Sequence, residues 1–348
     1  GVLLGNAEAE FKAFVEKTGI PSAWTILGAG AIPSDHPLNV GMLGMHGNYG
    51  PNVLTNECDV LIAIGMRFDD RVTGRLDKYA RQAKVIHLDI DPAEIDKNVK
   101  TEVPLWGDCK ETLPLLTALV KENKHTEWLA KFRDFDQKEM EQCIDAEINP
   151  TSGELTMGEV INQLNKLTDG NAIIVTDVGQ HQMVACRYAK LNHTRSNITS
   201  GGLGTMGFAL PAAIGAKFGA LDRTVVAIIG DGGFQMTLQE LGTIMQSGID
   251  VKIMILNNQF LGMVRQWQEL FNDRRYSFVD ITSPDFVALA KSYYIEASKV
   301  SERENLKGAI ETMLNHKGSY LLEVMVTKEN NVFPMVPQGC SVSEIRLK

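Results

Sequence analysis

The sequence predicts an α/β protein built from two doubly wound parallel-sheet domains, and three observations lead to this prediction. Apolar segments of strand length alternate with helical patterns along both halves of the 348-residue chain. A polar, charge-rich stretch at 126–153 separates the halves and ends in Pro, Ser and Gly, as linkers do. The length is sufficient for two domains that each bury a core. We therefore expect domains at residues 1–125 and 154–348.

Composition and charge exclude several classes of protein. The net charge of −9, without any Lys/Arg cluster, argues against binding to nucleic acid or to an anionic membrane surface. Five cysteines without a C-x-x-C pair argue against disulfides and zinc, and fit a reducing cytoplasm. No apolar run is long enough to span a bilayer. The start at Gly1, without Met or signal peptide, suggests a truncated piece of a longer protein.

The first half alternates strands and helices. Asp91 followed by Pro92 is an N-cap pattern and predicts the start of another helix. The Gly- and Pro-rich segment 32–52 is expected to be mostly loop. The remaining predictions are strands at 24–27, 59–64, 84–90 and 103–106 and helices at 11–18 and 110–120.

The second half repeats this alternation. Thr237 and Glu240 form a capping-box pattern that predicts a helix, which Gly248 ends. The tail 330–348 carries no periodic pattern. The remaining predictions are strands at 172–176, 225–229, 251–256 and 320–326 and helices at 155–167, 208–219, 261–267, 284–294 and 304–315.

Two polar side chains follow two buried strands in this half. Asp231 follows strand 225–229 within the run GDGG at 230–233, and Asn258 follows strand 251–256. The strands and the helix between them form a βαβ unit, so both residues lie at the carboxyl edge of a parallel sheet, where ligands bind. A carboxylate, an amide oxygen and a nearby carbonyl suit Mg²⁺, and Gly232 and Gly233 allow a diphosphate to approach the backbone. The alternative is that Asp231 only caps a turn and Asn258 only ends a strand.

Two further patterns have competing interpretations. The run GGLGTMG at 201–207 contains G-x-G-x-x-G, but the preceding residues 195–199 are too polar for the strand of a dinucleotide-binding dehydrogenase, so we set that alternative aside. Arg67 and Arg71 follow a strand, where they could bind phosphate or carboxylate or simply pair with Asp69 and Asp70. His46, Met263 and Trp267 could likewise be structural.

With these residues described, the chain resembles the catalytic large subunit of acetolactate synthase, a thiamin diphosphate (ThDP) enzyme. The resemblance covers the central and C-terminal domains of that family. Its most specific motifs are MLGMHG (42–47), RFDDRVTG (67–74), TSGGLGTMG (199–207) and GMVRQW (262–267). Gly-Asp-Gly and Asn-Asn at 230–232 and 257–258 resemble the ThDP signature itself.

The resemblance implies three cofactors. Mg²⁺ would be held by Asp231, Asn258 and the backbone carbonyl of Phe260, and Met206 would force ThDP into its bent conformation. The positions matching ThDP contacts are Gln180, His181, Gln182, Gly204, Met206, Asp231, Gly232, Gly233, Asn258, Gly262 and Met263. The first domain would hold FAD without a redox role, at Thr25, Ile26, Leu43, Gly44, Met45, His46, Gly65, Arg67, Asp69, Arg71, Val72, Asp89, Ile90, Asp108 and Cys109.

The implied reaction is decarboxylation of pyruvate and ligation of the product to a second 2-keto acid, pyruvate or 2-oxobutyrate. Arg71 would bind the carboxylate of that second acid, and Trp267 with Met263 would shape its pocket and favour 2-oxobutyrate. The family acts as a homodimer or tetramer of catalytic subunits, with a regulatory small subunit. Its N-terminal pyrimidine-binding domain has no counterpart in the sequence, so we expect the 348 residues alone to be inactive. Pyruvate oxidase, glyoxylate carboligase and a binding fragment without activity are the alternatives.

Overall fold

The computed structural model describes residues 1–348, which form two compact units. Unit 1 contains residues 1–144, 192–195 and 333–348, and unit 2 contains residues 145–191 and 196–332. Both are α/β units with parallel sheets, which confirms the predicted fold class. No helix is long and apolar enough to cross a membrane.

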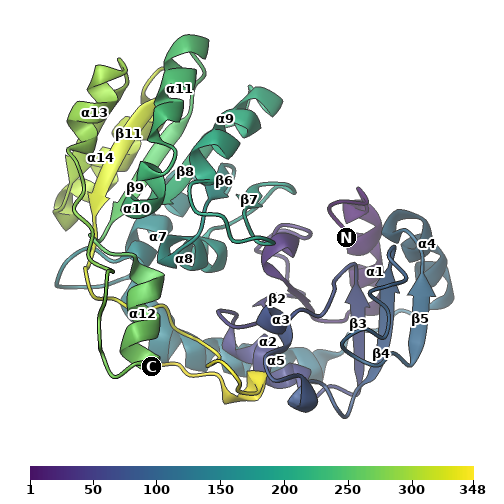
Figure 1. Ribbon diagram of the computed structural model, residues 1–348. Helices are drawn as coiled ribbons and strands as arrows, with labels where there is room; N and C mark the ends of the chain where they lie inside the picture. Colours follow the sequence, from purple (N-terminus) through teal and green to yellow (C-terminus); the bar gives the residue numbers. More distant parts are fainter. The chain divides into compact units, whose positions relative to one another are not determined.

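Unit 2 is organised around one six-stranded parallel sheet with the strand order β10-β11-β9-β8-β6-β7 (Figure 1). The central strands are apolar and buried on both faces, as expected for a parallel sheet covered by helices. The strands are β6 (Ile173–Thr176), β7 (Asn197–Thr199), β8 (Val225–Gly230), β9 (Lys252–Asn257), β10 (Glu296–Val300) and β11 (Tyr320–Met325).

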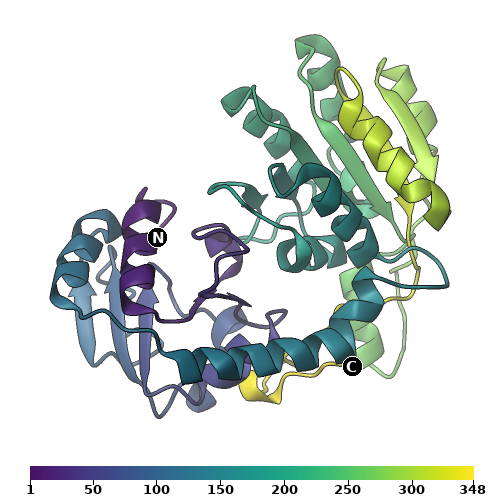
Figure 2. The same ribbon diagram turned by 180° about the vertical axis from the view of Figure 1, so that it is seen from behind.

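Helices cover both faces of this sheet. Val225, Ala227 and Ile229 of β8 join the main core with side chains of α9, α10, α11 and α13, while α7, α8 and α14 lie on the other face (Figures 1 and 2). The helices are α6 (Asp145–Ile148), α7 (Met157–Thr168), α8 (Gln180–Tyr188), α9 (Ala209–Gly219), α10 (Asp231–Gln235), α11 (Leu241–Ser247), α12 (Gly262–Phe271), α13 (Phe286–Ser292) and α14 (Arg303–Asn315).

Unit 1 has a three-stranded parallel sheet, β3-β4-β5, and a separate parallel pair, β1-β2. Helices α1 and α4 cover one face of the larger sheet, and the other face packs against Phe68, Tyr79 and Val342. The elements are α1 (Glu8–Thr18), β1 (Ser22–Trp24), β2 (Asn39–Met42), α2 (Tyr49–Thr55), β3 (Val60–Ile64), α3 (Asp70–Thr73), β4 (Lys84–Asp89), β5 (Val103–Trp106), α4 (Cys109–Leu119) and α5 (Thr126–Glu139), which continues as a π-helical turn, Met140–Ile144.

The C-terminal segment 333–348 packs within unit 1, although it follows the last strand of unit 2 in sequence. The backbone N–H of Val336 donates to Met45, the N–H of Arg75 donates to Cys340, and Gly74 and Ser341 form an antiparallel bridge. A capping box between Ser341 and Glu344 starts the 3₁₀ turn Val342–Glu344. The tail therefore has defined local structure, although its sequence shows no periodic pattern.

One helix predicted from the sequence is absent, and another starts later than predicted. Asp91 accepts a hydrogen bond from the N–H of Ala93, but turns follow instead of a helix, and Asp96 has a left-handed φ of 63° that a helix does not allow. Thr237 donates its hydroxyl proton to the carbonyl of Gly207 instead of capping, so a 3₁₀ turn precedes α11. Gly248 does end α11 in the left-handed conformation, with φ 64°.

Several elements were not predicted from the sequence, including helices α3, α8 and α10. The segment 32–52 contains β2 and the start of α2, where mostly loop was expected. Strand β10 was not predicted. The polar residues Asn197–Thr199, judged too polar for a strand, form β7, because a strand at the edge of a sheet needs no apolar residues on both faces.

Candidate functional site

Asp231 and Asn258 lie at the carboxyl ends of neighbouring parallel strands in unit 2. Strands β8 and β9 pair in register from Val226 opposite Lys252 to Gly230 opposite Leu256, so Asp231 and Asn258 each follow closely after the last pairs. Both side chains are buried, at 1% and 4% exposure. The predicted placement of these two residues at one sheet edge agrees with this register.

Asp231 is a buried carboxylate that forms no ion pair with a Lys or Arg side chain. Burial raises its pKa to about 6, although hydrogen bonds from Ser283 and from the backbone of Asp231 and Gly232 act in the opposite direction. The hydroxyl of Ser283 donates to Oδ2 of Asp231 over 3.1 Å. Ser283 was missed by the sequence analysis, because it lies 52 residues further along the chain in an irregular segment. A cation beside Asp231 would offset the cost of burying its charge.

Asn258 starts a tight turn that leads into α12. Its Oδ1 accepts a hydrogen bond from the N–H of Phe260 over 3.2 Å, and its Nδ2 donates to Oε1 of Gln180 over 3.3 Å. Gln259, between them, has a left-handed φ of 59°. This backbone turns the chain sharply after β9. The backbone N–H of Leu261 and the carbonyl of Gln259 bond to Val279 and Ile281, so a second segment fixes the turn.

The glycines near the strand ends have neighbours that leave no room for a side chain. A Cβ on Gly233 would lie 2.0 Å from Oδ2 of Asp177, and one on Gly262 would lie 2.2 Å from Oε1 of Gln180. A Cβ on Gly232 would lie 2.9 Å from Leu261. Sequence reasoning assigned these glycines to the approach of a diphosphate. In the structure, neighbouring side chains of the same chain occupy the space that a Cβ would need, so these positions require glycine even without a diphosphate.

His181 and Asp177 form a buried pair beside this edge. Nε2 of His181 lies 2.5 Å from Oδ1 of Asp177, and the histidine ring packs against Gly179 and Gly230, where an added Cβ would lie 2.8 to 2.9 Å from it. The other oxygen of Asp177 accepts the N–H of Gly207 over 2.9 Å. Asp177 was not among the predicted site residues. Its signal was available, because it directly follows β6 just as Asp231 follows β8.

Gln180 and Gln266 connect the site to α12. Nε2 of Gln180 donates to Oε1 of Gln266 over 3.0 Å, and that oxygen also accepts the N–H of Val332. Gln182 is directed elsewhere, because its Nε2 donates to the hydroxyl of Thr199 over 2.8 Å. Three of the predicted residues, Gln180, His181 and Asn258, are therefore held by buried hydrogen bonds at one edge of the sheet.

Met263 and Trp267 lie one turn apart on α12 and are half-buried. The buried residues of the helix are Arg265 and Gln266. The ring of Trp267 lies 4.9 Å from that of Phe271. Both side chains therefore keep an accessible face, and whether they line a pocket stays a prediction.

The loop before α9 carries Gly204 and Met206. Gly204 is exposed, with a positive φ of 67° and no atom close to the place of a Cβ, while Met206 is half-buried. The loop is anchored at its end, where Gly207 donates to Asp177. At its tip, Leu203 is 95% exposed.

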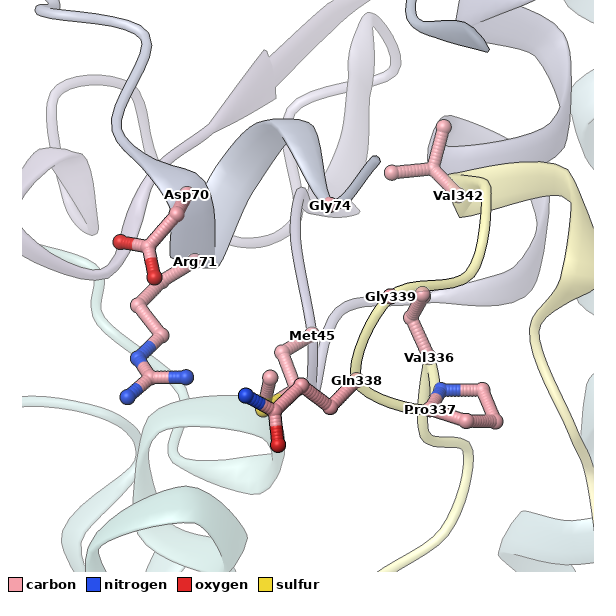
Figure 3. Close-up of a pocket in the computed structure, with 9 residues that line it drawn as sticks. All are labelled: Met45, Asp70, Arg71, Gly74, Val336, Pro337, Gln338, Gly339 and Val342. Carbon is pink, nitrogen blue, oxygen red and sulfur yellow. The ribbon is translucent and has the colours of Figure 1, made fainter. Parts of the chain in front are cut away.

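In unit 1 the two arginines of the RFDDRVTG motif behave differently. Nε of Arg67 lies 3.4 Å from Oδ2 of Asp69. Arg67 therefore forms an ion pair with a neighbouring carboxylate, which was the alternative to binding a phosphate or carboxylate ligand. The guanidinium of Arg71 has no hydrogen-bond or ion-pair partner within the chain. It lines a pocket of about 80 Å³ together with Met45, Asp70, Gly74, Val336, Pro337, Gln338, Gly339 and Val342 (Figure 3).

The positions matched to FAD form two groups in unit 1. One group is tied together by backbone hydrogen bonds, in which Leu43 donates to Trp24 and Met45 donates to Arg71. It includes Thr25, Ile26, Leu43, Gly44, Met45, His46, Arg71 and Val72. The other lies at or after the carboxyl ends of β3, β4 and β5 and includes Gly65, Arg67, Asp69, Asp89, Ile90, Asp108 and Cys109.

The acidic members of the second group already have local roles. Asp69, Asp89 and Asp108 each accept a backbone N–H two residues further along, which caps a turn or a helix start. Cys109 is buried, and burial raises the pKa of its thiol. Ile90 is 65% exposed and Trp106, whose Nε1 donates to Ile90, is 74% exposed. This exposed apolar pair at the strand ends suits the flat ring of a bound cofactor.

The donor set at the edge of the unit 2 sheet fits a magnesium diphosphate. Asp231 supplies a carboxylate, Asn258 an amide oxygen and Phe260 a backbone carbonyl that accepts no hydrogen bond within the chain. Hard oxygen ligands of this kind, completed by phosphate and water, are what Mg²⁺ prefers. Clusters of three or more His, Cys, Asp or Glu side chains, which softer metals would use, are absent.

The comparisons with known proteins agree with this geometry. The central-domain model of thiamine pyrophosphate enzymes matches residues 1–116, and their C-terminal TPP-binding domain model matches residues 177–324. The acetolactate synthase isozyme 2 large subunit of Escherichia coli (strain K12) is 42% identical over 346 residues, 99% of this chain and 62% of the relative.

Two further relatives give the same result. Acetolactate synthase 1, chloroplastic, of Nicotiana tabacum is 43% identical over 98% of this chain and 52% of the relative. The acetolactate synthase large subunit of Lactococcus lactis subsp. lactis (strain IL1403) is 42% identical over 96% of this chain and 58% of the relative. The chain thus spans between 52% and 62% of the length of these three relatives. It belongs to the thiamine pyrophosphate enzymes and is homologous to the acetolactate synthase large subunits.

Proposed function

We propose that this chain is part of an acetolactate synthase, which decarboxylates pyruvate and ligates the product to a second 2-keto acid. The observation that carries the proposal is the pair of buried oxygen ligands, Asp231 and Asn258, at the ends of adjacent parallel strands within a region that matches a TPP-binding domain. The relatives, named acetolactate synthase, support the choice of reaction within that family.

The proposed metal site consists of Asp231, Asn258 and the carbonyl of Phe260. Ser283 holds one oxygen of Asp231, which leaves the other for the metal ion. Asn258 is held through its Nδ2 by Gln180. Both ligands are therefore fixed before the metal binds, and the entropy lost on binding is small. Bound ThDP would supply the electron sink that allows a 2-keto acid to lose CO₂.

The remaining ThDP contacts in the proposal follow the resemblance. We place the diphosphate next to Gln180, His181 and Gln182 and to the glycines at 232, 233 and 262, and the aminopyrimidine next to Gly204 and Met206. The half-buried Met206 is available to support the bent cofactor from one side.

For the second substrate we propose Arg71, Met263 and Trp267. The guanidinium of Arg71 has no partner in the chain, so it is available to bind a carboxylate through two parallel hydrogen bonds. The accessible faces of Met263 and Trp267 would contact the alkyl group of the acid. An additional methyl group in such a contact is typically worth about 1–3 kcal/mol, which favours 2-oxobutyrate.

The proposal extends to further cofactors and partners. FAD would bind to unit 1 without a redox role, over the two groups of residues described above. The relatives named large subunits suggest a small subunit as partner, and we propose a homodimer or homotetramer of catalytic chains. From the odd number of cysteines we also propose a cytoplasmic location. The domain limits at 125 and 154 stay a prediction.

The test is a product assay on the natural full-length protein with ThDP, Mg²⁺, FAD and pyruvate. Acetolactate, and 2-aceto-2-hydroxybutyrate when 2-oxobutyrate is added, are the expected products. Acetyl phosphate with peroxide would identify a pyruvate oxidase instead, and tartronate semialdehyde from glyoxylate would identify a glyoxylate carboligase. Binding of ThDP without any product would leave only a binding module.

A further inference from the structure

The pocket in unit 1 contains an uncharged polar side chain without a partner, besides Arg71 and Asp70. The amide of Gln338 lines the same pocket, and neither of its atoms makes a hydrogen bond within the chain. Figure 3 shows the guanidinium of Arg71 and the amide of Gln338 on the same side of the pocket, with the side chain of Met45 beside Gln338. The two residues are far apart in sequence, so the fold of unit 1 brings them together.

The backbone on both sides of Gln338 is fixed, although its side chain is exposed. Before it, Val336 donates to the carbonyl of Met45 over 2.7 Å. After it, the carbonyl of Cys340 accepts the N–H of Arg75 over 2.9 Å, and Gly339 turns the chain with a positive φ of 76°. The amide of Gln338 is therefore held at the tip of a fixed turn, and it forms no hydrogen bond within that turn.

The charges of the pocket determine what it can accept. Its charged groups are Arg71 and Asp70, which lie side by side without forming an ion pair, and Gln338 adds a neutral donor and acceptor (Figure 3). A carboxylate has more lone pairs than the fork of one guanidinium occupies. The NH₂ group of Gln338 can satisfy one of the remaining lone pairs without adding charge.

From this arrangement we propose that Gln338 determines the affinity for the second 2-keto acid, by donating a hydrogen bond from Nε2 to the carboxylate that Arg71 binds. The inference rests on the proposed function, because it needs an acidic substrate at Arg71. No covalent step is assigned to Gln338. Its contribution is to the binding of the second acid alone, and not to the decarboxylation of the first.

The test compares Gln338→Glu and Gln338→Met in the natural full-length protein. At fixed pyruvate, the 2-oxobutyrate concentration for half-maximal formation of 2-aceto-2-hydroxybutyrate should rise at least tenfold for Gln338→Glu, because the new carboxylate competes for Arg71 and repels the substrate. Gln338→Met, which only removes the donor, should raise it roughly threefold to tenfold, as expected for one hydrogen bond to a charged group. The rate of CO₂ release in a single turnover of pyruvate, which precedes the binding of the second acid, should not change.

The matched control is Gln246→Glu, the same substitution at an exposed residue of α11 that lines no pocket. It should behave as the unaltered protein does. Combining Gln338→Met with Arg71→Met should give less than the product of the two single effects, since both residues act on one carboxylate. Three results would each overturn the inference. They are unchanged half-maximal concentrations in the Gln338 variants, fully multiplicative effects in the double variant, or a loss of single-turnover CO₂ release as large as the loss of product formation.

Failure of the proposed function would be recognised separately, because the unaltered protein would then form no acetohydroxy acid. In that case the inference is judged on this chain by NMR, with pyruvate as the probe. Pyruvate should shift the Nε–H signal of Arg71 in the unaltered chain, and Gln338→Glu should shift it without pyruvate. The absence of both shifts would show that the two side chains do not share a carboxylate site.

Discussion

The sheet edges of the two units differ in how completely the chain organises them. In unit 2, Asp231, Asn258 and His181 are buried, and each forms a hydrogen bond with another side chain, that of Ser283, Gln180 and Asp177 respectively. In unit 1, the corresponding edge has exposed arginines and the exposed apolar pair Ile90 and Trp106. Buried polar groups must be paired to avoid a desolvation cost, whereas exposed groups need no partner.

This difference suggests different modes of binding. In unit 2, the side chains proposed as ligands are already held in position before a metal ion and a diphosphate bind. The cost is that the ionised carboxylate of Asp231 is buried. The edge of the unit 1 sheet can cover a flat, large cofactor but imposes little geometry on it. The first arrangement suits chemistry, and the second suits a structural cofactor.

The largest expected effect concerns the crowded glycine in unit 2. Gly233→Ala would place a methyl group 2.0 Å from Oδ2 of Asp177, which is completely buried and cannot move away. We expect a loss of about 3 kcal/mol in the free energy of unfolding, the upper part of the usual range for overpacking. Urea denaturation measures it. Gly202→Ala is the control, because no atom lies within 4 Å of the added group. Equal midpoints for the two variants would contradict the crowded arrangement.

The next effect concerns the cost of the buried carboxylate. The folded-state pKa of Asp231 is about 6, above the ordinary value of 3.8, so ionisation of Asp231 destabilises the metal-free chain increasingly from pH 4 to pH 6 and fully above it. Asp231→Asn removes this cost. We expect the variant to be about 2 kcal/mol more stable at pH 7 with EDTA and equally stable near pH 4. Thermal unfolding at both pH values measures the difference, and a variant less stable at pH 7 would disprove it.

Trp267 tests the half-exposed face of α12. Trp267→Leu in the natural full-length protein should lower the preference for 2-oxobutyrate over pyruvate by about 1 kcal/mol, which is roughly fivefold. The reason is that its ring presents an accessible face in addition to its contact with Phe271. Competition between the two acids, with both products quantified, measures the ratio. Val264→Leu, at an exposed position on the same helix, is the control. An unchanged product ratio would remove Trp267 from the second-substrate pocket.

The smallest effect is expected at the open edge in unit 1. Arg67 is more than half exposed where it pairs with Asp69, so Arg67→Ala should change the free energy of unfolding by less than about 0.5 kcal/mol. Retention of FAD on gel filtration should nevertheless fall if the edge binds it. A large loss of stability would show that this edge is as tightly organised as the one in unit 2.

Local patterns in the sequence were sufficient for the residues that follow strands. Alternation of apolar runs and helices placed Asp231 and Asn258 on neighbouring parallel strands, and the register of β8 and β9 agrees. The same reasoning could have included Asp177 after β6. The helix starts predicted at Asp91 and Thr237 were wrong, because the side chains of these residues form other hydrogen bonds with the backbone. Asp91 accepts from the nearby N–H of Ala93, and Thr237 donates to the distant carbonyl of Gly207.

Contacts between distant segments could not be predicted. Ser283 reaches Asp231 across 52 residues from a segment without regular structure. The C-terminal segment returns to unit 1 and places Gln338 in the pocket of Arg71, although no periodicity marks it. The motif RFDDRVTG also did not indicate which arginine is paired, since both flank the same two carboxylates. Only the three-dimensional arrangement separates Arg67 from Arg71.

The most direct test of the account is calorimetric titration of the natural full-length protein with ThDP, with Mg²⁺ and then with EDTA. We predict binding that requires Mg²⁺, that is lost in Asp231→Ala because one charged ligand of an octahedral site is missing, and that persists in the exposed control Asp222→Ala. Equal heats for Asp231→Ala and the unaltered protein, or binding that is insensitive to EDTA, would contradict the assignment of Asp231 and Asn258 as a magnesium diphosphate site.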